Sequence, residues 1–81
     1  MKYGQYIMKY EFEIRNTHFL IRADGREVYA CDTACIKPRK LYNAKALVLE
    51  AAIMSHTDIA PELCEDIALK TLEQGYTSHT I

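Results

Sequence analysis

Cysteines and histidines are the residues of this chain whose types could support metal binding or thiol chemistry. Cys31 and Cys35 are separated by three residues, Cys64 lies further along, and the histidines stand at positions 18, 56 and 79. Structural zinc sites usually combine two closely spaced ligand pairs, whereas this chain has a single Cys pair. An odd number of cysteines without a secretory signal is typical of reduced thiols. We therefore expect structural thiols, no metal site and no cofactor.

Nucleophilic catalysis would require a thiol or hydroxyl, a base and an orienting group close together. The predicted strand pairing below places His18 opposite Cys31, and such a pair can lower the pKa of a thiol. No recognisable catalytic or phosphate-binding motif accompanies it, and the chain has three glycines in all. We expect a protein that is not an enzyme and has no catalytic residues; a thiol or metal enzyme is the least favoured alternative.

Charge is divided unequally along the chain. Residues 1–45 carry nine basic and five acidic groups, whereas residues 46–81 carry one basic and six acidic groups. The densest basic cluster is Lys37-Pro38-Arg39-Lys40, directly before a predicted helix, where cations are unfavourable for the helix itself. This placement is compatible with a solvated loop or with a contact to an anionic partner. The net charge of −1 excludes binding to nucleic acid by bulk attraction alone.

Alternating apolar and charged residues predict strands in the first half of the chain. Residues 7–15 place Tyr10, Phe12 and Ile14 on one side and charged residues on the other. Residues 18–23 are rich in strand formers, Asp24-Gly25 is a strong hairpin signal, and residues 26–31 complete a third strand. These segments predict an antiparallel meander.

Two hairpin registers define the faces of this meander. The first pairs Glu11 with Arg22, and the second pairs Arg22 with Glu27. The expected inner face consists of Phe12, Ile14, Phe19, Ile21, Val28 and Ala30. The expected outer face consists of the rows Glu11–Arg22–Glu27, Glu13–Leu20–Tyr29 and Arg15–His18–Cys31.

Helical composition and periodicity replace this alternation in the second half. We predict helices over residues 39–55 and 59–74. The first has an apolar stripe of Leu41, Ala44, Val48 and Ala51, and the second has a stripe of Ala60, Leu63, Cys64, Ile67, Ala68, Thr71 and Leu72. Gly75 is placed to end the second helix, and residues 76–81 are expected to form a frayed tail.

The predicted fold class is α+β. A three-stranded antiparallel β-meander is covered on one face by two C-terminal α-helices, giving a β-β-β-α-α two-layer sandwich. The length of 81 residues fits a single domain over residues 1–81. Because the sequence shows no signal peptide and no apolar run near the length of a membrane span, we expect a cytoplasmic protein without membrane association.

These features favour a small non-enzymatic macromolecule-binding protein that acts as an inhibitor, adaptor or regulatory subunit. It would bind a protein through the outer sheet face and the basic loop, whose aromatic, Arg and Leu content is typical of interfaces. The candidate partner-binding residues are Glu13, Arg15, Leu20, Arg22, Tyr29, Lys37, Arg39 and Lys40. In size and style the chain is similar to small stand-alone proteins of phages and mobile elements, including inhibitors of host defence, although no motif carries this likeness.

Two further expectations concern partners. The alternative function is nucleic-acid binding through the three-stranded sheet and the 37–40 cluster, which the outer-face carboxylates Glu11, Glu13 and Glu27 oppose. A homodimer is compatible with the small core and with an exposed edge strand.

Overall fold

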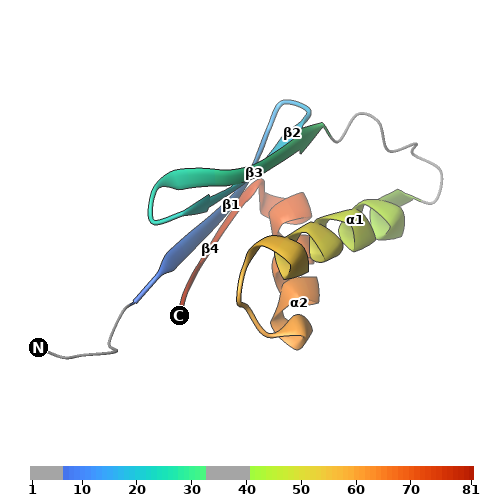
Figure 1. Cartoon of the computed structure of the whole chain (residues 1–81). Helices are drawn as coiled ribbons and strands as arrows, with labels where there is room; N and C mark the ends of the chain where they lie inside the picture. The colour runs from blue at the N-terminus through green and yellow to red at the C-terminus, as the bar shows by residue number, and fades with distance from the viewer. Residues whose placement is uncertain (1–6, 33–40) are drawn as a thin grey trace, which may run out of the picture.

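A computed structural model describes residues 7–32 and 41–81 of the chain, in the element order β-β-β-α-α-β. The strands are β1 (Lys9–Arg15), β2 (His18–Ala23), β3 (Arg26–Asp32) and β4 (Tyr76–Thr80), and the helices are α1 (Leu41–His56) and α2 (Pro61–Gln74). The protein is therefore α+β, with an antiparallel sheet and two helices (Figure 1). The basic cluster of residues 37–40 and Cys35 lie outside the described residues.

The sheet has the strand order β3-β2-β1-β4. The predicted register between β1 and β2 is confirmed, because Phe12 pairs with Ile21 and Glu11 pairs with Arg22. Asn16 and Asp24 adopt positive φ angles of 57° and 53° in the two hairpin turns, and Gly25 follows with a φ of 82°. Residues of these types tolerate the left-handed conformation that two-residue hairpin loops require.

The register between β2 and β3 differs from the prediction after its first two pairs. Arg22 pairs with Glu27 as expected, but Ile21 then pairs with Tyr29, so Val28 is an extra residue in β3. Such a β-bulge shifts every later residue of the strand by one position. Tyr29 and Cys31 consequently join the helix-facing side, and Ala30 moves to the outer face opposite Leu20. The predicted inner positions of Val28 and Ala30 are wrong, and both residues are exposed.

The C-terminal residues form a fourth strand, which corrects the expected three-stranded sheet and frayed tail. Gly75 ends α2 in the left-handed conformation, with a φ of 82°, and donates its N–H to the Thr71 carbonyl. This helix stop turns the chain back towards β1, where Phe12 pairs with Thr77 and Glu11 pairs with Ser78. Strand β4 thus completes the sheet on the edge that β1 would otherwise leave open.

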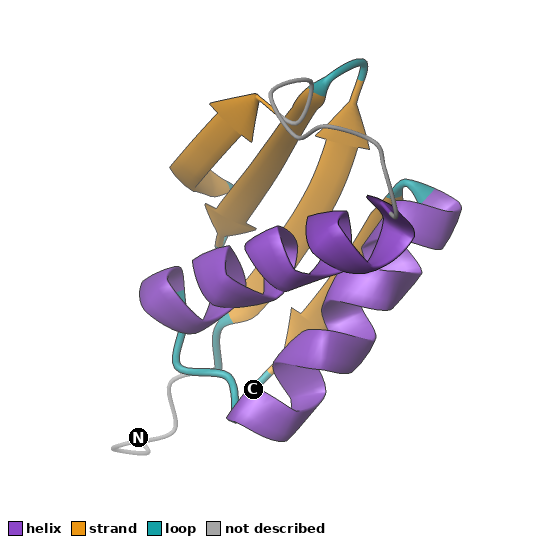
Figure 2. Ribbon diagram, turned by 90° about the vertical axis from the view of Figure 1, so that its right-hand side faces the viewer, coloured by secondary structure: helices purple, strands orange, loops and turns teal. Residues whose placement is uncertain are grey.

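Both helices pack on the same face of the sheet, and no element of the described ranges 7–32 and 41–81 covers the other face (Figure 2). The core between the layers is centred on large, fully buried side chains of both layers: Phe12, Phe19 and Ile21 from the sheet and Leu49 and Ile53 from α1. From α2 the core receives Cys64, Ile67, Ala68 and Thr71. This agrees with most of the stripe predicted for α2, although Ala60 and Leu63 are exposed.

The stripe predicted for α1 is wrong at Val48 and Ala51, which are exposed. Over residues 46–56, the buried side chains are those of Ala46, Leu49, Ala52 and Ile53. The burial of Leu41 and Ala44 lies outside what the structure describes. Apolar residues lie nearly all around this helix, so sequence periodicity does not single out the face that packs. Several apolar side chains of α1 are therefore left on the surface, with Leu47 reaching 64% exposure.

Candidate functional site

The uncovered face of the sheet, called the open face below, is the candidate site. Its side chains come from alternate positions of all four strands. The strand pairing places on it Lys9, Glu11, Glu13, Arg15, His18, Leu20, Arg22, Glu27, Ala30, Asp32, Tyr76, Ser78 and Thr80. Charged and polar groups dominate this set, because no helix covers them and they keep contact with water.

A continuous network of ion pairs and hydrogen bonds crosses the open face from β4 to β2. The Tyr76 hydroxyl donates to Glu11 Oε2 at 2.7 Å, and Arg22 Nε donates to Glu11 Oε1 at 3.4 Å. Arg22 Nη2 also donates to Glu13 Oε1 at 3.0 Å. Arg15 completes the network through Nη2, which lies 3.2 Å from Glu13 Oε1.

The central members of this network are held more firmly than typical surface ion pairs. The side chains of Arg22, Glu11 and Glu13 are 24%, 21% and 22% exposed, whereas that of Arg15 is 65% exposed. Arg22 bridges two carboxylates that stand two positions apart on the neighbouring strand. An arginine shared in this way has little freedom to rotate, so the charges of the open face have defined positions.

The network shifts the pKa values of its carboxylates and of Arg22 in directions that favour their charged forms. The hydrogen bond from Tyr76, aided by Arg22, lowers the pKa of Glu11, and hydrogen bonds from Arg22 and Arg15 lower the pKa of Glu13. In return, the hydrogen bonds to Glu13 and Glu11 raise the pKa of Arg22. The hydrogen bond that the Tyr76 hydroxyl donates to Glu11 raises the pKa of Tyr76, which keeps this hydroxyl neutral. The open face therefore carries fixed ionised groups at neutral pH.

The structure brings together half of the predicted partner-binding residues. Glu13, Arg15, Leu20 and Arg22 lie on the open face, with Glu13 paired directly to Leu20. Lys37, Arg39 and Lys40 lie outside the described residues. Tyr29 does not belong to this face, because the bulge at Val28 turns it towards the helices.

Tyr29 and Cys31 instead form part of the contact between sheet and helices. The Tyr29 ring stacks on the His56 ring at the end of α1, with 4.3 Å between centroids. The neighbouring Cys31 side chain raises the pKa of Tyr29. The predicted adjacency of His18 and Cys31 is wrong, because Cys31 pairs with Phe19 and His18 pairs with Asp32. A thiol–imidazole couple is therefore absent from this position.

Tyr76 is the member of the ion-pair and hydrogen-bond network that sequence reasoning missed. It lies in the segment expected to fray, yet it anchors the network through its bond to Glu11. A strand could have been predicted directly after the helix stop at Gly75, because Tyr76, Thr77 and Thr80 are strong strand formers. Their short run of five residues and the lack of large apolar side chains weakened that signal.

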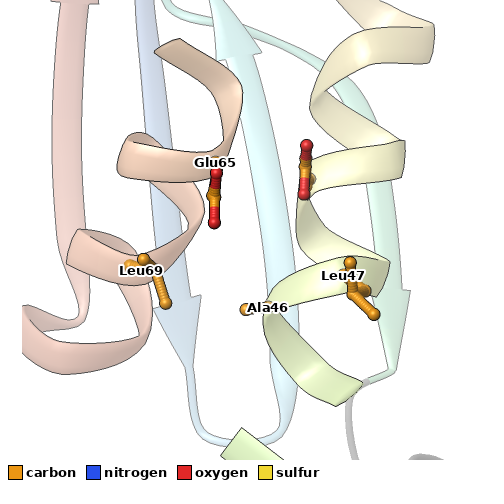
Figure 3. Close-up of a pocket in the computed structure, with 5 residues that line it drawn as sticks. Ala46, Leu47, Glu65 and Leu69 are labelled. Carbon is orange, nitrogen blue, oxygen red and sulfur yellow. The ribbon is translucent and has the colours of Figure 1, made fainter. Parts of the chain in front are cut away.

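A second surface feature is a shallow depression of about 410 Å³ between the helices. Ala46, Leu47 and Glu50 line it from α1, and Glu65 and Leu69 line it from α2 (Figure 3). It combines apolar side chains with two carboxylates from opposite helices.

The thiols and acidic groups show no arrangement for metal chemistry in the described part of the chain. Among residues 7–32 and 41–81, no group of three or more His, Cys, Asp or Glu residues could hold a metal ion. Cys64 is buried, and burial raises the pKa of its thiol. The thiol donates to the Ile59 carbonyl at 3.6 Å. Cys64 therefore acts as a small, protonated core residue.

Comparisons with other proteins complete the description of the site. No helix in the described ranges is long and apolar enough to cross a membrane. The chain matches no protein-family model, no curated protein sequence and no solved structure.

Proposed function

We propose that the protein is a small binding protein that recognises another protein through the open face of its sheet. Its role would be that of an inhibitor, adaptor or regulatory subunit, and binding rather than catalysis would be its activity. The observation that carries this proposal is the ordered network Tyr76–Glu11–Arg22–Glu13–Arg15 on a face that no helix covers.

The defined geometry of these charges supports recognition of a specific partner. Arg22 is already held between two carboxylates, so a partner would not have to order it on binding. Side chains that are ordered in the free protein reduce the entropy cost of association. Leu20, paired with Glu13 and Ala30, adds a partly exposed apolar contact to the charged surroundings. Fixed charges around an apolar contact favour selectivity and orientation in a protein complex.

The balance of charges on the open face favours a protein partner over nucleic acid. Each guanidinium of the network is engaged with a carboxylate, and Glu27 and Asp32 add further negative charge. A phosphate backbone would be repelled by these carboxylates and would have to displace them from the arginines. The alternative of nucleic-acid binding would rest on residues 37–40, which lie outside the described residues.

Quantitative affinity capture from the cells that naturally make the protein tests this function. The bait proteins are the wild type, Leu20→Ser, Arg22→Met and, as a matched control on the opposite layer, Leu47→Ser. The proposal predicts a protein that is retained by the wild type and by Leu47→Ser but is depleted about tenfold with the two open-face variants. Retention of the same proteins by all four baits would overturn the assignment of the open face.

A titration with salt separates the alternative function from the proposed one. Duplex DNA and single-stranded RNA are offered to the wild type at increasing ionic strength. Binding through phosphate contacts weakens steeply as salt increases. Tight binding with this steep dependence would replace the proposed protein partner by nucleic acid, whereas weak binding that is independent of salt supports the proposal.

A further inference from the structure

The two edges of the sheet are unequally protected against pairing with another strand. On the β3 edge, the bulge at Val28 interrupts the ladder, and the strand carries Arg26, Glu27 and Asp32. Bulges and charged side chains are the usual devices that prevent edge-to-edge association. The β4 edge has the sequence Tyr-Thr-Ser-His-Thr, regular pairing to β1, and neither a proline nor an Asp, Glu, Lys or Arg.

The hydrogen bonds to β1 determine which backbone groups β4 presents at its free side. Ile14 donates its N–H to the Gly75 carbonyl at 2.9 Å, and Ile81 donates its N–H to the Met8 carbonyl at 3.0 Å. Bonds to one antiparallel neighbour recur at every second residue, so Thr77 and His79 also face β1. Tyr76, Ser78 and Thr80 therefore direct their N–H and C=O groups away from the sheet. None of these groups bonds to another residue in the described part of the chain.

We propose that β4 is a self-association edge, at which a second copy of this chain adds its own β4 in antiparallel orientation. A two-fold axis at Ser78 would place Ser78 opposite its counterpart and Tyr76 opposite Thr80 of the other copy. This arrangement engages all three outward-facing residues and joins the two sheets into one. The inference is independent of the partner proposed for the open face.

The side chains at this edge fit a second copy without electrostatic cost. On the open face, the pairs would be Ser78 with Ser78 and Tyr76 with Thr80, and on the helix side Thr77 would lie opposite His79. None of these residues is an acid or a strong base, so no like charges would face each other across the axis. A two-fold pairing of identical strands also gives both copies the same number of bonds, which is the usual geometry of small dimers.

The experiment measures the oligomeric state by sedimentation and light scattering. Protein concentrations run from about 1 to 100 µM, so that a dimer with a dissociation constant in the micromolar range would dissociate on dilution. Ser78→Pro is the test variant. The Ser78 N–H faces outward, so proline removes an edge donor without removing a bond to β1. Ser78→Ala is the matched control, because it removes the hydroxyl and keeps the backbone donor.

The proposal predicts a wild-type dimer that dissociates on dilution. Ser78→Ala should dimerise like the wild type, and Ser78→Pro should raise the dimer dissociation constant about tenfold or more. Circular dichroism establishes that each variant is folded. If Ser78→Pro does not fold, Ser78→Lys takes its place, since two lysines would face each other at the axis and the dimer should partly recover at high salt.

A substitution at the other edge completes the test. Ala30 lies on the open face of β3, at the edge of the sheet opposite β4. Ala30→Lys should therefore leave the dimer unchanged. A wild type that is monomeric throughout the concentration range would overturn the proposal. A dimer that persists with Ser78→Pro or Ser78→Lys, or that is lost with Ala30→Lys alone, would also overturn it, because the copies would then meet through another surface.

Discussion

Phe12 and Glu13 are neighbours in β1, yet they lie in opposite environments. Phe12 is fully buried beneath the helices, whereas Glu13 lies on the open face between two arginines. The helix-facing side gains its stability from the burial of apolar surface, which is the largest favourable contribution to folding. On the open face, folding replaces the hydration of charged groups by ion pairs, and this replacement contributes little to stability. The first face therefore maintains the fold, and the second is free to be specialised for recognition.

The largest difference between the faces should appear on truncation of Phe12. Phe12→Ala removes a fully buried ring from the centre of the core and should lower the free energy of unfolding by about 3–5 kcal/mol. Leu20→Ala, at a partly exposed position of the open face, should cost well under half as much. Urea denaturation measures both. Equal losses would remove the energetic distinction between the two faces.

A smaller effect is expected at Thr71, the buried polar residue beneath β4. Its hydroxyl donates to the Ile67 carbonyl at 2.8 Å, and its oxygen lies 3.0 Å from the Thr77 hydroxyl. Thr71→Val keeps the shape of the side chain and removes both bonds, so it should lower the free energy of unfolding by about 1 kcal/mol. Thermal unfolding monitored by circular dichroism measures this. A variant as stable as the wild type would mean that the bond between Thr71 and Thr77 does not help to hold α2 to β4.

The contribution of the open face should be seen in how the stability of the protein depends on acidic pH. The lowered pKa values of Glu11 and Glu13 mean that their network stabilises the protein above their usual pKa of 4.5. This stabilisation is lost as the pH falls from 4.5 through the lower pKa values of the folded state. Arg22→Met removes the shared cation, so the variant should be less stable than the wild type at pH 7 and should approach it near pH 3.

Arg15→Met serves as the control for this acid titration. Its side chain is 65% exposed, and among the described residues its guanidinium pairs with one carboxylate, that of Glu13. Its loss should therefore change the acid profile less than the loss of Arg22. Thermal midpoints measured between pH 7 and pH 3 compare the three proteins. Parallel profiles for the wild type and Arg22→Met would show that the network has no role in the acid response.

The smallest effect is expected at alkaline pH. The bond to Glu11 raises the pKa of Tyr76 above its usual value of 10. The associated stability is present below pH 10 and is lost as the pH rises through the raised pKa. Tyr76→Phe should therefore flatten the stability profile above pH 10. Tyrosinate absorbance, measured as the pH is raised, follows the ionisation of the tyrosines. If every tyrosine of the wild type ionised at the usual pKa near 10, the bond between Tyr76 and Glu11 would be contradicted.

Sequence reasoning predicted best where a face pattern and a turn signal agreed. The pairing of Glu11 with Arg22 follows from the alternation of apolar and charged residues in β1 and from the hairpin loop. The apolar stripe predicted between Ala60 and Leu72 contains all the buried residues of α2. In α1, apolar residues all around the helix left several packing faces equivalent, and the buried residues became Leu49 and Ile53. Only the packing of the sheet below selects among such faces.

The features that escaped prediction depend on long-range contacts. The bulge at Val28 moves Tyr29 from the expected binding face to the ring of His56, a partner far away in sequence. Strand β4 is polar and short, and its formation depends on the free edge of β1 rather than on its own composition. The candidate site was therefore predicted in part, with Arg22 and its acidic neighbours correct and Tyr76 missed.

The adjacency of β1 and β4 also has a consequence for the order in which the protein can assemble during synthesis. Among the described strands, β1 is synthesised well before its neighbour β4, because β4 follows both helices in the chain (Figure 1). Until then the β1 backbone has an unpaired side, and the hydroxyl of Thr71 lacks its partner Thr77. Pairing between strands so distant in sequence is intrinsically slow and leaves a nascent edge open to misassociation. A nascent chain that stops before Tyr76 should therefore leave the β1 edge of the meander unpaired and prone to aggregation.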